Sequence, residues 1–309
     1  MTSVDLAAEA AADLAHPPLR GPRRARLFAW LMAGPASLVM LAIMVYPLTN
    51  LLLLSLRDYD GASVTAYQWV GLANYEAMLA DPRFWAALRR TLAYCLLSVT
   101  ASLALGTLMA FVVNRRFRGV TVLRTVFILP MVAMPVASAL VFEAMMNPNQ
   151  GILNQMLEAA GLPPYAWLAH PGSALLSLVV LEVWMGAPFV MLIVLAGLQS
   201  MPQEPLEAAR IDGATPLQAL WFVTLPMLRS ALATAVLFKL IDTLKQFATI
   251  WVLTEGGPLR STETLYVYGY ALAFQFFDVG YGAAILMALL VLVLFVSLLW
   301  MRVRERAWV

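Results

Sequence analysis

Six apolar runs, each at least twenty residues long, constrain the fold of this chain more than any other feature. They cover residues 27–56, 91–113, 122–145, 174–198, 230–253 and 282–301. A helix of about 20 residues rises about 30 Å, which is the thickness of the hydrocarbon core of a bilayer. The sequence therefore predicts an all-α integral membrane protein with six transmembrane helices.

The composition argues against a soluble fold. Hydrophobic residues make up 62% of the 309 residues and charged residues only 12%, whereas a soluble domain carries about 25% charged residues. The single cysteine, Cys95, lies inside the second run, so an internal disulfide is excluded.

Arginines are unequally divided between the two sets of loops. Residues 147–173 hold no lysine or arginine, and the charges of the other outer loops are partly offset by acidic residues. Arg89 and Arg90 run against this trend. Their position in an outer loop is explained if their side chains anchor at the headgroup layer. Because loops rich in arginine stay in the cytoplasm, we expect both termini to be cytoplasmic. The arginines of the cytoplasmic set are Arg20, Arg23, Arg24, Arg26, Arg115, Arg116, Arg118, Arg124, Arg210, Arg229, Arg302, Arg304 and Arg306.

The segments outside the runs are expected to be tails and surface helices. Residues 1–26 lack the apolar core of a signal peptide and are expected to form a flexible cytoplasmic tail. Residues 302–309 are expected to form a cytoplasmic C-terminal tail. The aromatic, amphipathic residues 74–90 predict one or two interfacial helices, interrupted near Asp81-Pro82. Residues 152–160 predict a short helix in the second outer loop.

A polar cassette lies between the fourth and fifth runs. It is Glu207-Ala208-Ala209-Arg210-Ile211-Asp212-Gly213, followed after nine residues by Val223-Thr224-Leu225-Pro226. Pro205 suits the first turn of a helix, and the helix dipole favours Glu207 near that end. The small side chains of Ala208 and Ala209 permit close approach by another molecule.

The second half of the cassette predicts another helix. Gly213 lets the chain turn, and Thr215 and Pro216 suit the N-cap and first position of a helix that ends at Leu225-Pro226. The cassette is thus predicted to be a helix-turn-helix on the cytoplasmic surface. It is either an element that transmits force from a soluble partner or a plain amphipathic interface helix.

Charged residues inside the runs need an explanation, because burying them in a membrane is costly. They are Glu143, Glu182, Lys239, Asp242 and Lys245. Lys239, Asp242 and Lys245 follow at steps of three, so the acid can bridge both bases along one side of a helix.

Two interpretations of these charges remain open. In one they form internal salt bridges that include Glu182. In the other they line a cavity with Trp184, Gln246 and Phe247, where hydroxyl groups are hydrogen-bonded and sugar rings pack on aromatic faces. Gly186 and Pro188 in the fourth run predict either a local unwinding of the helix or a simple kink.

Several activities are excluded by missing motifs. A phosphate-binding loop needs Gly-Lys before Ser or Thr, but the only lysines, Lys239 and Lys245, follow Phe238 and Leu244, so the chain cannot hydrolyse ATP by itself. No metal-ligand spacing or partnered nucleophile is present, and no basic patch suggests nucleic-acid binding. A secondary transporter driven by an ion gradient remains an alternative, although the two halves show no convincing repeat.

Residues 201–214 with Leu225-Pro226 resemble the EAA signature of permease subunits in bacterial ABC importers of the carbohydrate-uptake branch. The resemblance covers all but about the first 25 residues. It departs at Glu255, where the family often has Gly, and at Ala248, where an Asp is common. Further matching segments are 69–75, 81–85, 127–130, 251–258 and 261–265.

The resemblance implies a MetI-like permease fold in the bacterial inner membrane, with residues 27–301 as the permease domain and residues 199–229 as the coupling loop. The implied function is ATP-driven import of a sugar, oligosaccharide or polyol by alternating access. The implied partners are a second, related permease subunit, a cytoplasmic ATPase dimer that carries ATP and Mg, and an extracytoplasmic solute-binding protein. No cofactor or metal is expected on this chain. The implied ATPase-coupling residues are Glu207, Ala208, Ala209, Asp212, Gly213, Leu225 and Pro226.

Overall fold

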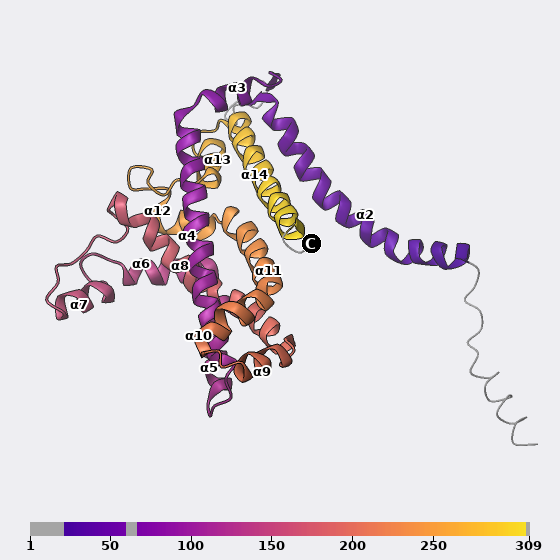
Figure 1. Cartoon of the computed structure of the whole chain (residues 1–309). Coiled ribbons are helices and arrows are strands. Elements are labelled where there is room, and N and C mark those ends of the chain that lie inside the picture. The colour runs from indigo at the N-terminus through magenta and orange to yellow at the C-terminus, as the bar shows by residue number, and fades with distance from the viewer. Residues whose placement is uncertain (1–21, 60–66, 307–309) are drawn as a thin grey trace, which may run out of the picture. The chain divides into compact units, whose positions relative to one another are not determined.

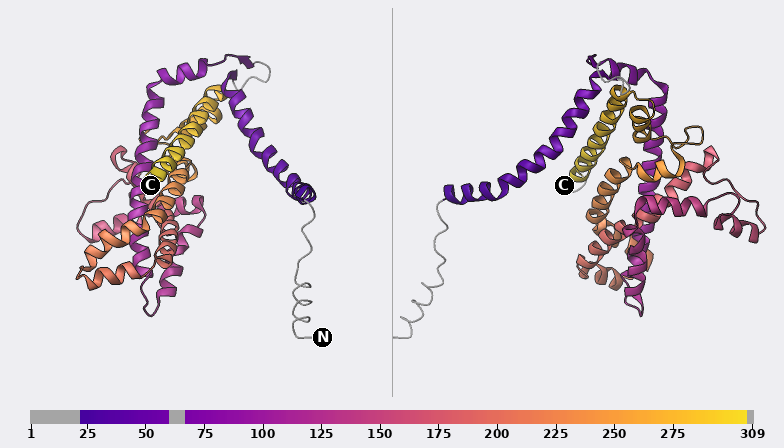
Figure 2. Two further views of the ribbon diagram at one scale, coloured as in Figure 1. Left: turned by 45° about the vertical axis from the view of Figure 1, so that its right-hand side comes forward. Right: turned by 180° about the vertical axis from the view of Figure 1, so that it is seen from behind.

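The computed structural model describes residues 22–59 and 67–306. The chain divides into two compact units, Met1–Leu53 and Leu54–Val309, and the second holds every site discussed below. Two short strands pair antiparallel, with Arg57 opposite Trp69. The elements, labelled in Figure 1 and seen from two further sides in Figure 2, are α2 Pro22–Ser55, β1 Arg57–Tyr59, β2 Tyr67–Trp69, α3 Ala73–Ala80, α4 Pro82–Val113, α5 Val120–Val132, α6 Pro135–Met145, α7 Ile152–Ala159, α8 Pro171–Ser200, α9 Glu204–Ile211, α10 Pro216–Ala219, the π-helical turn η1 Leu220–Thr224, α11 Leu225–Leu244, α12 Ala248–Thr254, α13 Leu265–Phe274 and α14 Val279–Arg306.

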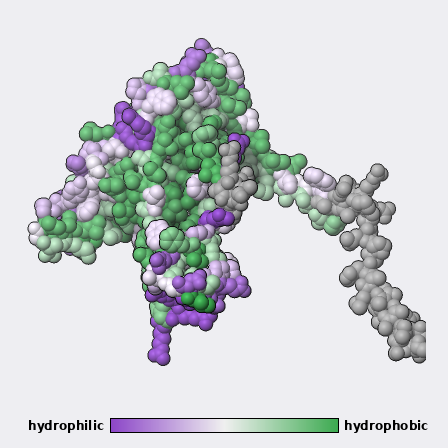
Figure 3. Space-filling view, in the orientation of Figure 1, coloured by the Kyte–Doolittle hydropathy of each residue, from purple (hydrophilic) through white to green (hydrophobic). Residues whose placement is uncertain are grey.

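The helices confirm an all-α membrane protein. Among the described residues, five helical stretches are long and apolar enough to cross a bilayer, and a sixth is added if the bent pair α5 and α6 counts as one span. Figure 3 shows apolar residues over the flanks of the second unit and polar residues gathered at the end where α9 and α10 lie. The cytoplasmic placement of the termini stays a prediction.

The ends of the expected tails are helical where they are described. Residues 22–26 belong to the start of α2, and residues 302–306 belong to the last turns of α14. The remainder of both expected tails, residues 1–21 and 307–309, lies outside the described residues.

The span expected over residues 122–145 is not a single helix. The structure has two helices there, α5 and α6, which are bent by 98°. Pro130 lies in the last turn of α5 and Pro135 in the first turn of α6, and the residues between them, Ala133 and Met134, are extended. Proline cannot donate a helical hydrogen bond and pushes the preceding residue out of the helical region, which accounts for the elbow.

The start of the second span also differs from expectation. The predicted break at Asp81-Pro82 is present, since α3 ends at Ala80 and Asp81 caps α4. However, α4 continues from Pro82 to Val113 without interruption. Residues 82–90 are therefore the first turns of a spanning helix, whereas the sequence predicted a separate interfacial helix.

The core of the second unit forms around the contact between α4 and α8. A Cβ atom added to Gly106 of α4 would lie 2.6 Å from Cβ of Val190 of α8, so the glycine permits this close approach. Buried apolar residues of α11 join the same cluster, among them Leu228 and Ala235. Since α8 and α11 also pack on each other, these three helices form one framework.

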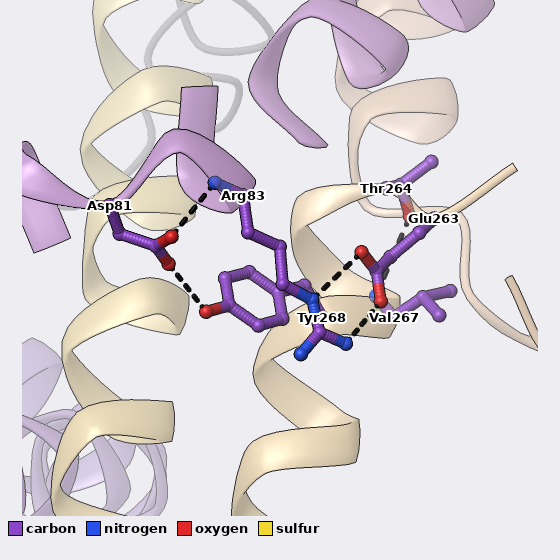
Figure 4. A network of polar contacts seen from close by, with 6 residues as sticks. All are labelled: Asp81, Arg83, Glu263, Thr264, Val267 and Tyr268. Atoms are coloured by element: carbon purple, nitrogen blue, oxygen red, sulfur yellow. Dashed lines mark hydrogen bonds and ion pairs between the residues drawn. The ribbon is translucent and has the colours of Figure 1, made fainter. Parts of the chain in front are cut away.

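A polar cluster ties the junction of α3 and α4 to α13 and α14 (Figure 4). Asp81 accepts hydrogen bonds from the hydroxyl groups of Tyr268 at 2.6 Å and Tyr281 at 2.9 Å, and from the backbone of Arg83 at 2.8 Å. The Arg83 guanidinium pairs with both carboxylate oxygens of Glu263, at 2.6 and 3.1 Å, and lies 4.3 Å from the ring centre of Tyr268. The cluster thus joins segments that are nearly 200 residues apart.

In acid, we expect this cluster to make stability depend on pH through Asp81. Burial alone would raise the pKa of Asp81, but hydrogen bonds from Tyr268, the Arg83 backbone and Tyr281 hold that pKa below its ordinary value of 3.8. A carboxyl group whose pKa is lowered by folding stabilises the fold above its unfolded pKa, and this stabilisation is lost as the pH falls through the folded value. Its contribution should be constant between about pH 5 and pH 8, fall as the pH drops below 3.8 and disappear below the lowered pKa of folded Asp81.

Thermal unfolding of the detergent-solubilised protein over a pH series measures this dependence. Asp81→Asn should unfold at a lower temperature at pH 7 and should lose part of the acid dependence. Asp58→Asn, which changes an exposed carboxylate on β1, is the matched control and should behave as the unsubstituted protein. Identical acid profiles for the Asp81→Asn and unsubstituted proteins would contradict this prediction.

Candidate functional site

A cavity of about 420 Å³ lies among α5, α6, α8, α11 and the residues that follow α11. Five of the seven predicted pathway residues line it: Glu182, Lys239, Asp242, Lys245 and Gln246. Its other lining residues are Met131, Pro135, Met185, Gly186, Phe189, Phe238 and Ile241.

A buried ion pair between α8 and α11 forms one wall of this cavity. The Lys239 ammonium group bonds to Oε1 of Glu182, and both side chains are 2% exposed. Gln246 Nε2 donates to Oε2 of Glu182 at 3.0 Å, and the Tyr94 hydroxyl group donates to the same oxygen at 3.3 Å. Three donors from α4, α11 and the segment after α11 therefore meet on one carboxylate.

The predicted charge ladder along α11 is only half present. Asp242 lies 3.7 Å from the Lys239 ammonium group, as its spacing predicted, and is 59% exposed. Lys245, at the end of α11, makes no ion pair with any residue that the structure describes. Lys239 bonds more closely to Glu182 on α8 than to Asp242, and the side chains of Asp242 and Lys245 both line the cavity.

The end of α11 explains a further departure from the sequence prediction. A single helix over residues 230–253 is wrong, because α11 ends at Leu244 and α12 begins at Ala248. The side-chain oxygen of Gln246 accepts a hydrogen bond from the backbone of Phe247 at 3.1 Å, while its amide donates to Glu182. Such side-chain bonds compete with the helical backbone pattern and favour a break.

Gly186 makes room for the buried lysine. The expected alternative of local unwinding near Pro188 is wrong, because α8 is continuous from Pro171 to Ser200. A Cβ atom at Gly186 would clash with the ammonium group of Lys239 and would lie 2.6 Å from its Cε atom. The absence of a side chain at Gly186 therefore allows Lys239 to lie against α8.

We expect Gly186→Ala to destabilise the protein by about 1–3 kcal/mol, because the added methyl group overpacks the site and displaces Lys239 from Glu182. Chemical or thermal unfolding in detergent measures the loss. Gly34→Ala is the matched control, since Gly34 is also helical but has nothing within 4 Å of the added atom. Equal stability of the two variants would show that Lys239 does not need the space at Gly186.

Trp184 and Phe247, the other two predicted pathway residues, do not line the cavity. Trp184 is 40% exposed and packs on Phe142, with ring centres 5.4 Å apart. Phe247 belongs to an aromatic cluster, with its ring centre 4.7 Å from that of Tyr270 and 5.6 Å from that of Trp251.

The sequence contained a signal for the lining residues that were missed. Met185, Gly186 and Phe189 follow Glu182 at helical steps of three, four and seven. The same period counted back from Lys245 would have found Ile241 and Phe238, four and seven residues earlier. Met131 and Pro135 reach the cavity because of the elbow between α5 and α6. In the sequence, only the prolines indicate this elbow.

The cassette forms two short helices, as its sequence predicted. Pro205 lies in the first turn of α9, and Gly213 adopts φ +81°, in the left-handed region that favours glycine. Thr215 caps α10 in a capping box, in which its hydroxyl group accepts from the backbone of Gln218 and Gln218 bonds back to the Thr215 backbone.

The second cassette helix does not end at Leu225-Pro226, which corrects the sequence prediction. It continues through the π-helical turn η1 into α11, and the backbone of Leu225 bonds to the carbonyl group of Leu220. The wider turn changes the hydrogen-bond pattern directly before Pro226, where an α-helical N–H group would be missing. The second cassette helix, α10 with η1, and α11 are therefore one helical rod.

The cassette presents a surface of mixed chemistry. Glu207, Ala208, Asp212, Gly213 and Pro226 are exposed, whereas Ala209 and Leu225 are half-buried. Two shallow hollows lie beside it, of about 510 and 370 Å³, and Phe222 lines both. Exposed apolar residues rimmed by polar ones are typical of a surface that binds another macromolecule. The large exposed apolar residues here are Ile211, Leu217, Trp221 and Phe222.

Comparisons with known proteins agree over most of the chain. The family described as "Binding-protein-dependent transport system inner membrane component" matches residues 102–306. The trehalose/maltose transport system permease protein MalF of Thermococcus litoralis is 35% identical over 284 residues, 91% of this chain and 94% of that protein. The trehalose transport system permease protein SugA of Mycobacterium tuberculosis is 34% identical, over 84% of this chain and 83% of that protein.

Further similarities extend to another solute and to a solved structure. The sulfoquinovosyl glycerol transport system permease protein SmoG of Agrobacterium fabrum is 31% identical, over 90% of both chains. A chain in the crystal structure of a bacterial alginate ABC transporter, in complex with an alginate pentasaccharide-bound periplasmic protein, has a TM-score of 0.79 and 22% identity. The match covers 92% of this chain and 96% of the alginate transporter chain. At 22% sequence identity, this similarity shows a shared fold.

Proposed function

The chain belongs to the family of inner membrane components of binding-protein-dependent transport systems, and from this premise we propose how its cavity and its cassette act together. It is a multi-pass permease subunit of a sugar ABC importer, and such subunits are not themselves enzymes. Its relatives are named for trehalose, maltose and sulfoquinovosyl glycerol. The proposed solute of this chain is likewise a sugar, oligosaccharide or polyol.

One observation carries the proposal: the cassette connects the two helices that hold the cavity's ion pair. Glu182 lies on α8, which leads into α9, and Lys239 lies on α11, which continues from α10 and η1. A displacement of the cassette therefore moves both walls of the cavity. This connection suits a protein in which a soluble motor must change the access of a membrane cavity.

In the proposed mechanism, a cytoplasmic ATPase dimer binds ATP and Mg and closes. The closure moves α9 and its neighbours, which meet the ATPase through Glu207, Ala208, Ala209, Asp212 and Gly213. The rod of α10, η1 and α11 then reorients the cavity from the outer to the inner face. A second, related permease subunit completes the pathway, and an extracytoplasmic solute-binding protein delivers the solute.

The cavity suits a polyhydroxylated solute. Its volume of about 420 Å³ falls within the range of about 300–1,000 Å³ typical of ligand sites. Asp242, Lys245 and Gln246 offer hydrogen-bond donors and acceptors, and the rings of Phe189 and Phe238, 6.0 Å apart, offer apolar faces. Sugars present hydroxyl groups and apolar ring faces that match both kinds of surface.

The alternative of an ion-driven secondary transporter has no support. The matching relatives are ABC transporter permeases. In addition, the buried carboxylate that could have coupled an ion, Glu182, is already held by Lys239.

Purification of the complex tests this function. The chain, tagged at its C-terminus, is extracted from native membranes in a gentle detergent, and the co-purifying proteins are identified by mass spectrometry. We expect an ABC ATPase and a second permease. Asp242→Ala is the matched control, since it should retain both partners but lower sugar uptake by whole cells. A chain that purifies alone from correctly inserted material would overturn the proposal.

A further inference from the structure

The loop between α4 and α5 carries a basic tip, Arg115-Arg116-Phe117-Arg118, which is called the arginine tip below. All three arginines are exposed, and Phe117 is 45% exposed. Figures 1 and 2 show this loop at the same end of the second unit as α9 and α10, and in each view it reaches farther from the helical body than they do. The tip therefore lies beside and beyond the cassette.

The base of the tip is held in place. Arg124 of α5 donates from Nη2 to the carbonyl oxygen of Val113 at 2.7 Å and from Nε at 3.3 Å, which ties α5 to the end of α4. The backbone of Val120 bonds to Phe117 at 3.3 Å, and Gly119 adopts φ +91°. A loop fixed in this way loses less conformational entropy on binding than a free one.

The charge of the tip is not balanced within the described chain. No acidic residue occurs from Val113 to Leu123, and the three arginines of the tip make no ion pair with any described residue. Arginine binds carboxylates through two parallel hydrogen bonds, and arginine and aromatic residues are enriched where proteins bind each other most strongly. An exposed aromatic ring between arginines thus suits an acidic protein surface.

We propose that the arginine tip makes a second contact with the ATPase. The tip binds an acidic patch on the ATPase surface, outside the region that receives α9. This inference rests on the proposed function, because it takes the cassette end to face the ATPase. The tip extends beyond the cassette, on the side where the soluble partner must lie.

The experiment compares two triple variants of the purified complex in nanodiscs of phosphatidylcholine, with and without phosphatidylglycerol. Arg115→Gln with Arg116→Gln and Arg118→Gln removes the charge, and the same positions changed to Lys keep the charge and the topology signal. NaCl is titrated, and the retained ATPase is measured. We expect the Gln variant to bind the ATPase about tenfold more weakly, as the loss of a few surface ion pairs predicts, and the Lys variant to stay closer to the unsubstituted complex.

A photo-crosslinking residue at Phe117 gives an independent readout. In the intact complex it should label the ATPase on a peptide rich in Asp or Glu. Three results would overturn the inference. The Gln variant could retain the ATPase at the same NaCl concentrations as the unsubstituted complex, or the crosslinker could label lipid alone. The third is that the Gln variant loses ATPase only when the disc contains phosphatidylglycerol. If the unsubstituted chain retains no ATPase, the proposed function fails as well, whereas the other results leave it intact.

Discussion

Replacing Lys239 by methionine should lower the free energy of unfolding by about 3–5 kcal/mol, because Glu182 would be left buried without a counter-charge. Both side chains are 2% exposed, so bulk water compensates the lost partner poorly. Thermal unfolding in detergent, followed by intrinsic fluorescence, measures the loss, and size-exclusion chromatography shows how much folded protein survives.

A double variant separates the charge from the shape of the site. Glu182→Gln together with Lys239→Met removes both charges, and most of the lost stability should return, because no uncompensated ion remains. Lys245→Met is the control, since Lys245 is exposed at the end of the same helix and its substitution should change the stability by less than about 0.5 kcal/mol. A Lys239→Met protein as stable as this control would refute the assignment of a buried ion pair.

Gly213→Val should abolish sugar uptake while the subunit still inserts in the membrane. The backbone at Gly213 has φ +81°, and an added Cβ atom would meet nothing within 4 Å. The substitution therefore acts through the backbone alone, where a left-handed conformation costs an L-residue about 1–2 kcal/mol and a β-branched one more. The turn between α9 and α10 would change, and the cassette would no longer fit its partner.

Uptake of labelled sugar by whole cells, with the membrane level checked by immunoblot, measures this effect. Gly161→Val is the matched control, because Gly161 has φ +76° and is equally open but lies in the loop after α7. Gly213→Asn should retain most activity, since asparagine tolerates the left-handed region. Normal uptake by Gly213→Val would remove the cassette from the coupling mechanism.

The number of membrane spans, five or six among the described residues, and the local shape of the cassette could be predicted because both depend on short-range rules. Apolar length predicts spans, and Pro205, Gly213 and Thr215 have fixed roles at helix ends. The prolines at positions 130 and 135 indicated the elbow between α5 and α6, but hydropathy alone does not show it. Runs of uniform hydrophobicity do not reveal bends, so helix boundaries were the weakest predictions.

The geometry of the cavity depended on tertiary contacts. The break after α11 has no glycine or proline and arises because Gln246 bonds to Glu182 on another helix. The direction of Lys239 depends on the empty space at Gly186, which the sequence indicated only as a kink or an unwinding. Trp184 was expected at the cavity as an aromatic face for a sugar ring, but it lies two residues from Glu182, and residues two apart on a helix face different directions.

The π-helical turn sets the rotational phase of everything that follows it. Each residue advances an α-helix by about 100°, so one residue more or less in Leu220–Thr224 would turn every later side chain of the rod by that angle. Lys239 would then point away from Glu182, and another face of α11 would meet the cavity. The length of this single turn therefore fixes which face of α11 lines the cavity for a given orientation of the cassette on its motor.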